Sequence, residues 1–246
     1  MKSLSVGDSL RASWKLTKKH FKFLFLAILA VLGTGIIHGI LNAIFQNPAI
    51  NFIITLIYLY VDLLIAVGMT NIYLKITGGE TPAWSDFIEK KEYVWRYLGM
   101  GFLVFLISFG VAMVVGGILA ALVTIAVPVG ITQIVLFIII GILALSGMIA
   151  IAIRYMMAPY LIIDKKYKII ASLKESKRLT KGNLWMVFRF LQAGMGVIIL
   201  GILCLFVGLF WAIPTSKLLF ASLYRQLSGE NMATADITVE PVAEVV

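Results

Sequence analysis

The feature that most constrains the fold of this chain is a long stretch without formal charge. Residues 97–153 contain no Asp, Glu, Lys or Arg. Because about 20 apolar residues suffice to cross the hydrocarbon core of a bilayer, this stretch is long enough for two crossings. Pro128 and Gly130 mark the turn between them. The whole chain is 61% hydrophobic and 13% charged, against roughly half and a quarter in soluble domains. The sequence therefore predicts an all-α, polytopic integral membrane protein.

Apolar runs and their breakers predict six transmembrane helices. The predicted crossings are residues 23–45, 52–74, 97–125, 131–153, 185–207 and 209–227. The connections after the first, third and fifth crossings contain no Lys or Arg, whereas the remaining segments carry nearly all of the positive charge. Lys and Arg concentrate in cytoplasmic loops. We therefore expect a multi-pass protein of a prokaryotic cell membrane with both termini in the cytoplasm.

A short basic pattern occurs twice, at residues 9–20 and 172–183. Both copies begin with Ser-Leu, continue to Leu-Thr-Lys and run into a long apolar segment. Such patterns predict amphipathic helices that lie in the membrane interface, with the apolar face toward the acyl chains and the basic face among headgroups. The expected apolar faces are Leu10, Trp14, Thr17, Phe21 and Leu24 in the first copy, and Ile169, Leu173, Ser176, Thr180 and Leu184 in the second.

The ends of the predicted units also match, since residues 71–78 resemble residues 222–229. We infer three parallel hairpin repeats, each preceded by a basic interfacial amphipathic helix. The repeats cover about residues 8–80, 84–164 and 167–229 of a single membrane domain, 1–229. The middle interfacial segment is weaker and contains Phe87, Val94, Trp95 and Leu98. Residues 230–246 contain four acids and no bases, which predicts a disordered cytoplasmic tail.

Two ionisable residues lie inside predicted crossings. Asp62 is in the middle of the second crossing and Lys217 is in the last one. Charged groups in the hydrocarbon layer are costly and face protein or water, so both are candidates for a functional site. Three interpretations remain open: a structural ion pair between the two helices, a pair that lines a transport pathway, or no contact, with Lys217 extending toward the headgroups.

The basic residues near the ends of the crossings are candidate contacts for anionic lipid headgroups, the partner that this charge pattern predicts. They are Lys15, Lys18, Lys19, Arg154, Lys177, Arg178, Lys181 and Arg189. We expect no nucleic-acid partner, because no domain that binds nucleic acids is recognisable. No cofactor or metal motif is present either. The single cysteine, Cys204, cannot form an intramolecular disulfide or a thiolate cluster and is expected to be an inert packing residue.

Residues 154–164 (Arg-Tyr-Met-Met-Ala-Pro-Tyr-Leu-Ile-Ile-Asp), the segment 172–183 and the closing Leu223-Tyr224-Arg225 carry a resemblance to a known family. Together they resemble the membrane domain attached to some prokaryotic glycerophosphodiester phosphodiesterases, and the related uncharacterised six-span membrane proteins. The resemblance implies the six-helix fold and a cell-membrane location. It does not imply phosphodiesterase activity, because this chain has no segment for the catalytic barrel.

Three functions are compatible with the sequence. The first is a non-enzymatic protein with a structural, scaffold or envelope-maintenance role that involves lipid headgroups. The second is a small transporter, channel or lipid-translocating protein with Asp62 and Lys217 in its pathway. The third is an intramembrane enzyme, which would need several catalytic polar groups at one depth. Because no catalytic constellation is found, the sequence favours the first.

Overall fold

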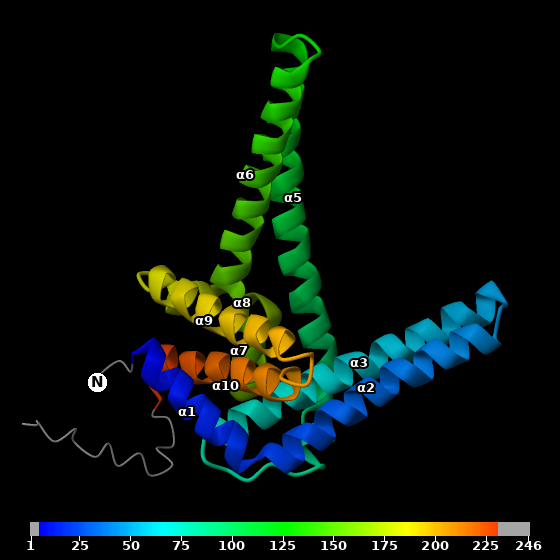
Figure 1. Ribbon diagram of the computed structural model, residues 1–246, viewed down its shortest axis with the longest axis vertical. Coiled ribbons are helices and arrows are strands. Elements are labelled where there is room, and N and C mark those ends of the chain that lie inside the picture. Colours follow the sequence, from blue (N-terminus) through cyan, green and yellow to red (C-terminus); the bar gives the residue numbers. More distant parts are fainter. Residues whose placement is uncertain (1–4, 231–246) are drawn as a thin grey trace, which may run out of the picture. The chain divides into compact units, whose positions relative to one another are not determined.

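The computed structural model describes residues 5–230, which form ten α-helices and one short 3₁₀ helix (Figure 1). Their bounds are α1 (Val6–Lys19), α2 (Phe21–Ile44), α3 (Pro48–Thr77), α4 (Asp86–Glu89), η1 (Lys91–Tyr93), α5 (Val94–Ala126), α6 (Ile131–Tyr155), α7 (Ala158–Asp164), α8 (Ile169–Thr180), α9 (Leu184–Leu203) and α10 (Leu209–Ser228). The prediction of an all-α chain is confirmed for these residues. The predicted tail at 230–246 lies, apart from Glu230, outside the described residues.

Within residues 5–230, five helices are long and apolar enough to cross a bilayer. They are α2, α3, the helix that contains α5, the helix that contains α6, and α9. Helices α2, α3, α5, α6 and α9 begin and end within a few residues of the predicted crossings, whereas the candidate span that contains α6 continues through α7 to Asp164. Their surfaces carry many exposed large apolar side chains, because a helix that faces lipid is apolar all round. The structure therefore supports a transmembrane protein.

The chain divides into two compact units. The described part of unit 1 comprises residues 5–58, 71–87 and 189–230, and unit 2 comprises residues 59–70 and 88–188. Unit 1 thus holds α1, α2, α10, most of α9 and both ends of α3. Unit 2 holds the middle of α3 and the helices from η1 to α8.

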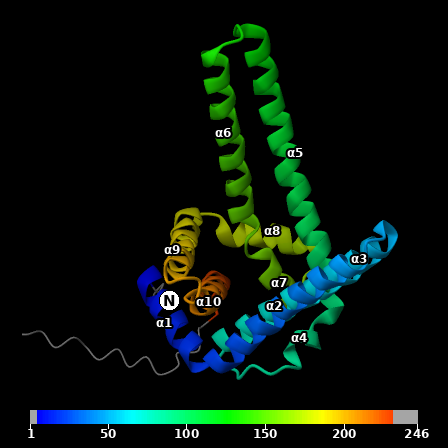
Figure 2. The same ribbon diagram turned by 45° about the vertical axis from the view of Figure 1, so that its right-hand side comes forward.

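In unit 1, α2 and α3 form an antiparallel hairpin (Figures 1 and 2). Asn47 caps α3 at the turn, where its side chain accepts a hydrogen bond from Ala49 N at 2.9 Å, and Pro48 occupies the first turn. The other end of the hairpin, where α2 begins and α3 ends, carries Lys22 and Lys75, and we call it the basic end.

The sixth predicted crossing corresponds to α10, which is not among the five candidate membrane spans. Near its start, the Trp211 ring stacks on Phe21 in the first turn of α2, with ring centroids 3.7 Å apart. Near its end, Arg225 contacts Leu74 and Thr77 in the last turn of α3. Both ends of α10 therefore lie at the basic end of the α2–α3 hairpin. A sixth crossing stays a prediction.

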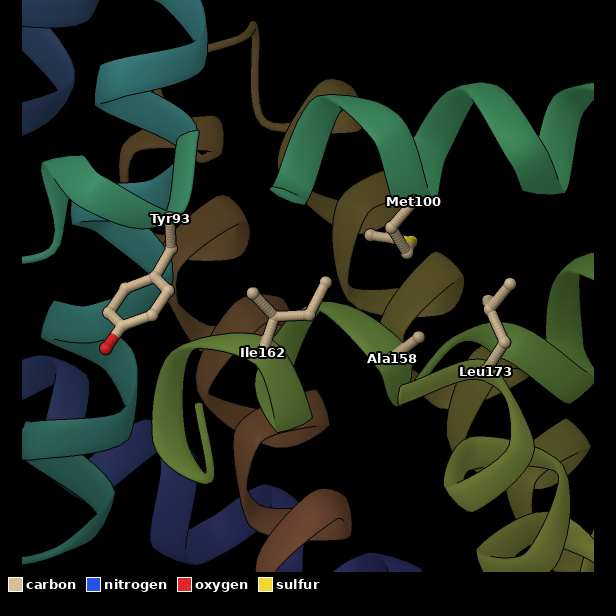
Figure 3. Close-up of a cluster of buried hydrophobic side chains, with 5 residues drawn as sticks. All are labelled: Tyr93, Met100, Ala158, Ile162 and Leu173. Atoms are coloured by element: carbon tan, nitrogen blue, oxygen red, sulfur yellow. The ribbon is translucent and has the colours of Figure 1, made fainter. Parts of the chain in front are cut away.

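In unit 2, α5 and α6 pack along each other as a second antiparallel hairpin (Figure 2). At its base, α7 and α8 join α5 around a cluster of buried side chains, shown in Figure 3. The cluster consists of Tyr93, Met100, Ala158, Ile162 and Leu173. Burial of these apolar side chains fixes α8 against the base of the hairpin.

Candidate lipid-headgroup interface

Helix α1 is two-sided, and its buried side is polar. Ser9, Ser13 and Thr17 are fully buried, at intervals that place them on one helical face. This face packs on α10, where Thr17 Oγ1 hydrogen bonds with Thr215 Oγ1 at 2.9 Å and Gln226 Nε2 donates to Ser9 Oγ at 2.8 Å. Small side chains let two helices approach closely, and buried hydroxyls need partners. The face of α1 is therefore a docking surface for α10.

Helix α8 uses the same positions of the repeated pattern. Ser172, Ser176 and Thr180 are fully buried. Ser176 Oγ donates to the Arg154 carbonyl at 3.0 Å, and Thr180 Oγ1 donates to the same carbonyl at 3.2 Å. Ser176 Oγ also accepts a hydrogen bond from Met157 N at 3.2 Å. These bonds satisfy backbone groups where α6 ends and α7 begins.

The break between α6 and α7 has a local cause. Pro159 has no N–H to donate to the carbonyl one turn earlier, so the helix cannot continue through it unchanged. Backbone groups freed by such a break are costly to bury without partners. The carbonyl that loses its donor to Pro159 is that of Tyr155. Ser176 instead bonds with the neighbouring Arg154 carbonyl and the Met157 N–H, so its hydroxyl satisfies backbone groups beside the break.

The predicted apolar face of the first copy is partly wrong. Leu24 is fully buried and so is Thr17, but Trp14 is 40% exposed, and Ser13 is buried in its place. The buried face is thus rotated toward the small polar residues, because the neighbour of α1 is the close-packed α10 rather than lipid alone. In the second copy, Leu173, Ser176 and Thr180 are buried in protein rather than turned toward acyl chains, and Leu184 is 39% exposed.

All eight predicted headgroup contacts are exposed on the described surface. These residues are Lys15, Lys18, Lys19, Arg154, Lys177, Arg178, Lys181 and Arg189. Lys18 Nζ lies 5.5 Å from the centre of the Trp14 ring, in cation–π geometry. Arg178 donates to Glu175 on the same helix at 2.8 Å, and this guanidinium lowers the pKa of the Glu175 carboxyl. Seven of the eight cations thus have no carboxylate partner among residues 5–230.

The middle segment departs from the predicted interfacial helix. Instead of one amphipathic helix, the chain forms the single turn α4, the 3₁₀ helix η1 and the start of α5. The segment is nevertheless docked on the end of α3. Lys75 Nζ donates to Asp86 Oδ1 at 2.7 Å, Asn71 Nδ2 donates to the Asp86 carbonyl at 3.2 Å, and Ala83 N donates to Asp86 Oδ2 at 2.7 Å.

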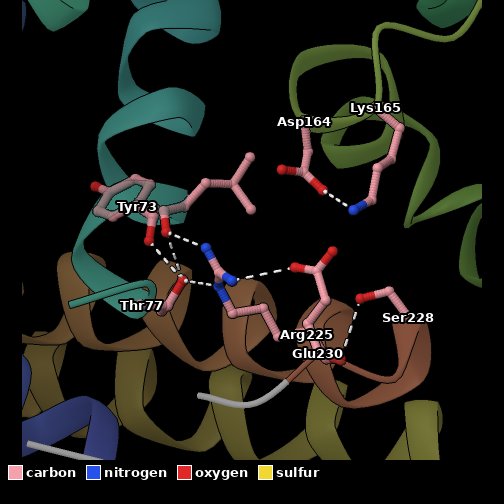
Figure 4. Close-up of polar contacts among 8 residues, drawn as sticks. Tyr73, Thr77, Asp164, Lys165, Arg225, Ser228 and Glu230 are labelled. Carbon is pink, nitrogen blue, oxygen red and sulfur yellow. Dashed lines mark hydrogen bonds and ion pairs between the residues drawn. The ribbon is translucent and has the colours of Figure 1, made fainter. Parts of the chain in front are cut away.

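A second polar cluster joins the matched ends of α3 and α10 in unit 1 (Figure 4). Arg225 Nη2 donates to the Leu74 carbonyl at 2.8 Å, and Arg225 Nε donates to Thr77 Oγ1 at 3.1 Å. Arg225 Nη1 forms an ion pair with Glu230 at 3.1 Å. The Leu74 carbonyl also accepts from Thr77 Oγ1 at 3.0 Å and from Gly78 N at 2.9 Å, so Arg225 adds a further, charged donor at the end of α3.

The candidate pair Asp62 and Lys217 is divided between the units. Asp62 lies in unit 2 and Lys217 in unit 1, and both side chains are exposed. Within its own unit, no described cation forms an ion pair with Asp62. Contact between the two residues therefore stays a prediction.

Three apolar grooves border the basic segments, and sequence reasoning missed some of the cations that line them. Arg11 and Lys18 line a groove of about 600 Å³ in unit 1. In unit 2, Arg154 lines a groove of about 420 Å³. A third, of about 890 Å³ and also in unit 2, is lined by cations that include Lys174. The sequence signal for Arg11 and Lys174 was present, because each directly follows the first Leu of the repeated pattern.

Cys204, expected to be an inert packing residue, is exposed and lines the groove in unit 1.

Among residues 5–230, no group of three or more His, Cys, Asp or Glu side chains could hold a metal ion. Comparison with protein-family models, with curated proteins and with solved structures finds no match for this chain. The resemblance to the membrane domain of glycerophosphodiester phosphodiesterases therefore stays a prediction.

Proposed function

We propose that this chain is a non-enzymatic integral membrane protein with a structural, scaffold or envelope-maintenance role, which it performs by holding anionic lipid headgroups. The supporting observation is the two-sided construction of α1 and α8. Each helix buries its hydroxyl face in protein and leaves its lysines exposed without carboxylate partners. Each cation near an anionic membrane surface adds about 1 kcal/mol of attraction.

The architecture that accompanies this proposal is three parallel hairpin repeats in the cell membrane of a prokaryote, with both termini in the cytoplasm. It is supported by three junctions at corresponding places in the chain. The segment before each hairpin docks on the last helix of another: α1 on α10, α4 on α3, and α8 on α6 and α7. In two of these junctions the bonded residues correspond. Lys75 near the end of α3 bonds with Asp86, and Gln226, at the aligned position near the end of α10, bonds with Ser9. Membership in the family of the phosphodiesterase membrane domain belongs to the same proposal.

Spin-labelled lipids test the proposed function. Proteoliposomes that contain spin-labelled phosphatidylglycerol or phosphatidylcholine report how strongly the protein immobilises each lipid. We expect preference for phosphatidylglycerol, weaker at high salt because salt screens surface charges. The variant Lys15→Gln/Lys18→Gln/Lys19→Gln should lose most of the contribution of α1. The variant with Arg at the same three positions keeps the charge and should retain it. Equal immobilisation of both lipids by the wild-type protein would refute the proposal.

The second candidate function is a transport pathway that contains Asp62 and Lys217. The observation that favours it is an exposed carboxylate on the long apolar helix α3, where an ionised group needs water or a cation. Flux of protons and potassium ions across proteoliposome membranes tests it. A pathway predicts flux that Asp62→Asn abolishes while the protein remains folded. A structural protein predicts no flux above that of protein-free vesicles.

A further inference from the structure

Two of the apolar grooves lie beside the two copies of the repeated basic helix. In unit 1 the groove of about 600 Å³ runs between α1, α9 and α10. In unit 2 the groove of about 890 Å³ lies between α5 and α8. Both volumes fall within the range of about 300–1,000 Å³ that is usual for small-ligand sites. Neither groove is lined by Asp or Glu.

The same position of the repeated pattern supplies a cation to each groove. Arg11 and Lys174 both directly follow the first Leu of the pattern, and both line their grooves. Further cations join them, namely Lys18 in unit 1, and Lys168 and Arg96 in unit 2. A ligand that fits must therefore combine an extended apolar part with a negatively charged part.

The groove in unit 1 lies at the basic end of the α2–α3 hairpin. Its wall includes Trp14 and Trp211, whose ring centroids are 5.6 Å apart. Trp211 in turn stacks on Phe21, in the first turn of α2. Tryptophan is enriched where the apolar layer meets the headgroups, which is the depth at which a lipid phosphate lies. Leu200 and Val197 of α9 provide the apolar surface.

We propose that each of these two grooves binds one anionic phospholipid. An acyl chain lies against the apolar wall, and the phosphate is held by Arg11 and Lys18 in unit 1 and by Lys168 and Lys174 in unit 2. Charge-assisted hydrogen bonds from these cations to phosphate oxygens favour an anionic over a zwitterionic headgroup, because a zwitterionic headgroup also carries a positive charge. The proposal rests on the proposed function, in which α1 and α8 lie among headgroups, and it adds defined sites to a diffuse attraction.

Native mass spectrometry of the full-length protein with phosphatidylglycerol and phosphatidylcholine of identical acyl chains tests this. The wild-type protein should retain up to two phosphatidylglycerol molecules in preference to phosphatidylcholine. Arg11→Gln/Lys174→Gln should weaken that retention about fivefold at each site. The matched control Lys15→Gln/Lys177→Gln removes the same charge from the same two helices, but at residues that line neither groove. It should lower lipid retention less than Arg11→Gln/Lys174→Gln, because it weakens only the diffuse attraction of the two helices.

A second pair of variants tests the position of the acyl chain. Leu200→Trp places a bulky side chain at the wall of the unit 1 groove, whereas Leu203→Trp alters an exposed position of α9 that does not line it. We expect only the first to release the lipid of unit 1. Arg11→Lys, which keeps the charge, should preserve binding even if the Gln variant fails to fold.

The outcomes separate this proposal from the proposed function. Equal losses in the Arg11/Lys174 and Lys15/Lys177 variants would overturn the grooves as sites but leave the diffuse attraction intact. Undiminished binding in Leu200→Trp would also overturn them. Absence of any preference for phosphatidylglycerol in the wild-type protein would overturn both proposals.

Discussion

Helices α1 and α8 carry the same buried sequence pattern but satisfy it differently. In unit 1, Thr17 and Ser9 of α1 bond with the side chains of Thr215 and Gln226. In unit 2, Ser176 of α8 bonds with the backbone at Arg154 and Met157. The pattern thus specifies a face that permits close packing, whereas the partner helix determines which groups the hydroxyls form hydrogen bonds with. Where the partner helix is broken, the hydroxyls complete its hydrogen bonding.

The side of the membrane on which the turn between α9 and α10 lies gives the strongest test of this comparison. Three hairpin repeats place Cys204, in the turn just before α10, on the side opposite to the lysines. An α10 that stays at the basic end of the α2–α3 hairpin, which both of its ends contact, would instead leave Cys204 on the same side as the lysines. In sealed vesicles, an impermeant maleimide should label Cys204 from the side opposite to the one that labels Lys177→Cys in a Cys204→Ser background. Labelling from the same side would contradict the third hairpin and restrict the comparison to α1 and α8 themselves.

The third junction extends the comparison to a buried carboxylate. Asp86 is 4% exposed and holds both Lys75 and the backbone of Ala83. Asp86→Ala should lower the free energy of unfolding by about 3 kcal/mol, because the Ala83 N–H loses its partner and the bond from Lys75 to a buried carboxylate is lost. Gln226→Ala, at the position matched to Lys75, removes one neutral bond and should cost about 1 kcal/mol. Chemical unfolding in detergent measures both. Equal losses would show that the Lys75–Asp86 ion pair stabilises the fold no more than the neutral Gln226–Ser9 bond.

The matched serines give the sharpest contrast between α1 and α8. Ser176→Ala leaves the buried Met157 N–H without its partner and removes a donor to the Arg154 carbonyl. We expect the free energy of unfolding to fall by about 2 kcal/mol. Ser13→Ala removes a bond to the Ser9 carbonyl within the same helix, so it should cost less than about 0.5 kcal/mol. Thermal unfolding of the two variants in the same detergent measures the difference. Similar losses would show that the hydroxyls of the two helices have the same role.

The smallest expected effect concerns pH and arises in only one copy. His20 follows α1, and the equivalent position after α8 is Asn183. Partial burial, and then the neighbouring Lys19, lower the pKa of His20 below its ordinary value. The unfolded chain therefore binds the proton more readily, and stability should fall as the pH decreases below about 6.5. Thermal unfolding at pH 7.5 and 5.5 should show a smaller loss for His20→Gln than for the wild-type protein. An unchanged loss would place the pH sensitivity elsewhere.

Much of the fold could be predicted because it consists of long helices, and each of these corresponds to a long, uninterrupted apolar segment of the sequence. The charge-free stretch 97–153 became the α5–α6 hairpin, with its turn near Pro128 as expected. Hydropathy and breakers are local signals, so the helix bounds agreed within a few residues. The last helix was harder, because its length suits a crossing while Lys217, Arg225 and several buried Ser and Thr lower its hydropathy.

The docking faces could be predicted only in part. Ser13 looks like a neutral, solvent-tolerant residue in a sequence, and only its neighbour α10, almost 200 residues later, makes it buried. The Arg225 cluster was missed for the same reason, since it joins α10 to the distant end of α3. The Lys75–Asp86 pair is local, 11 residues apart, but it depends on the fold of the irregular segment between α3 and α4. The sequence shows that Arg11 and Lys174 occupy the same position of the repeated pattern. The grooves that these two cations line depend on tertiary packing and could not be predicted from the sequence.

The central claim is that the repeated helix has one face in protein and the other among headgroups. Single cysteines at Ser13, Lys15, Ser176 and Lys177, each in a Cys204→Ser background, test it directly in sealed inside-out vesicles. We predict rapid reaction of an impermeant maleimide with Lys15→Cys and Lys177→Cys, and little reaction with Ser13→Cys and Ser176→Cys. Equal labelling of all four positions in the folded protein would contradict the claim, because it would show that neither helix is docked by its hydroxyl face.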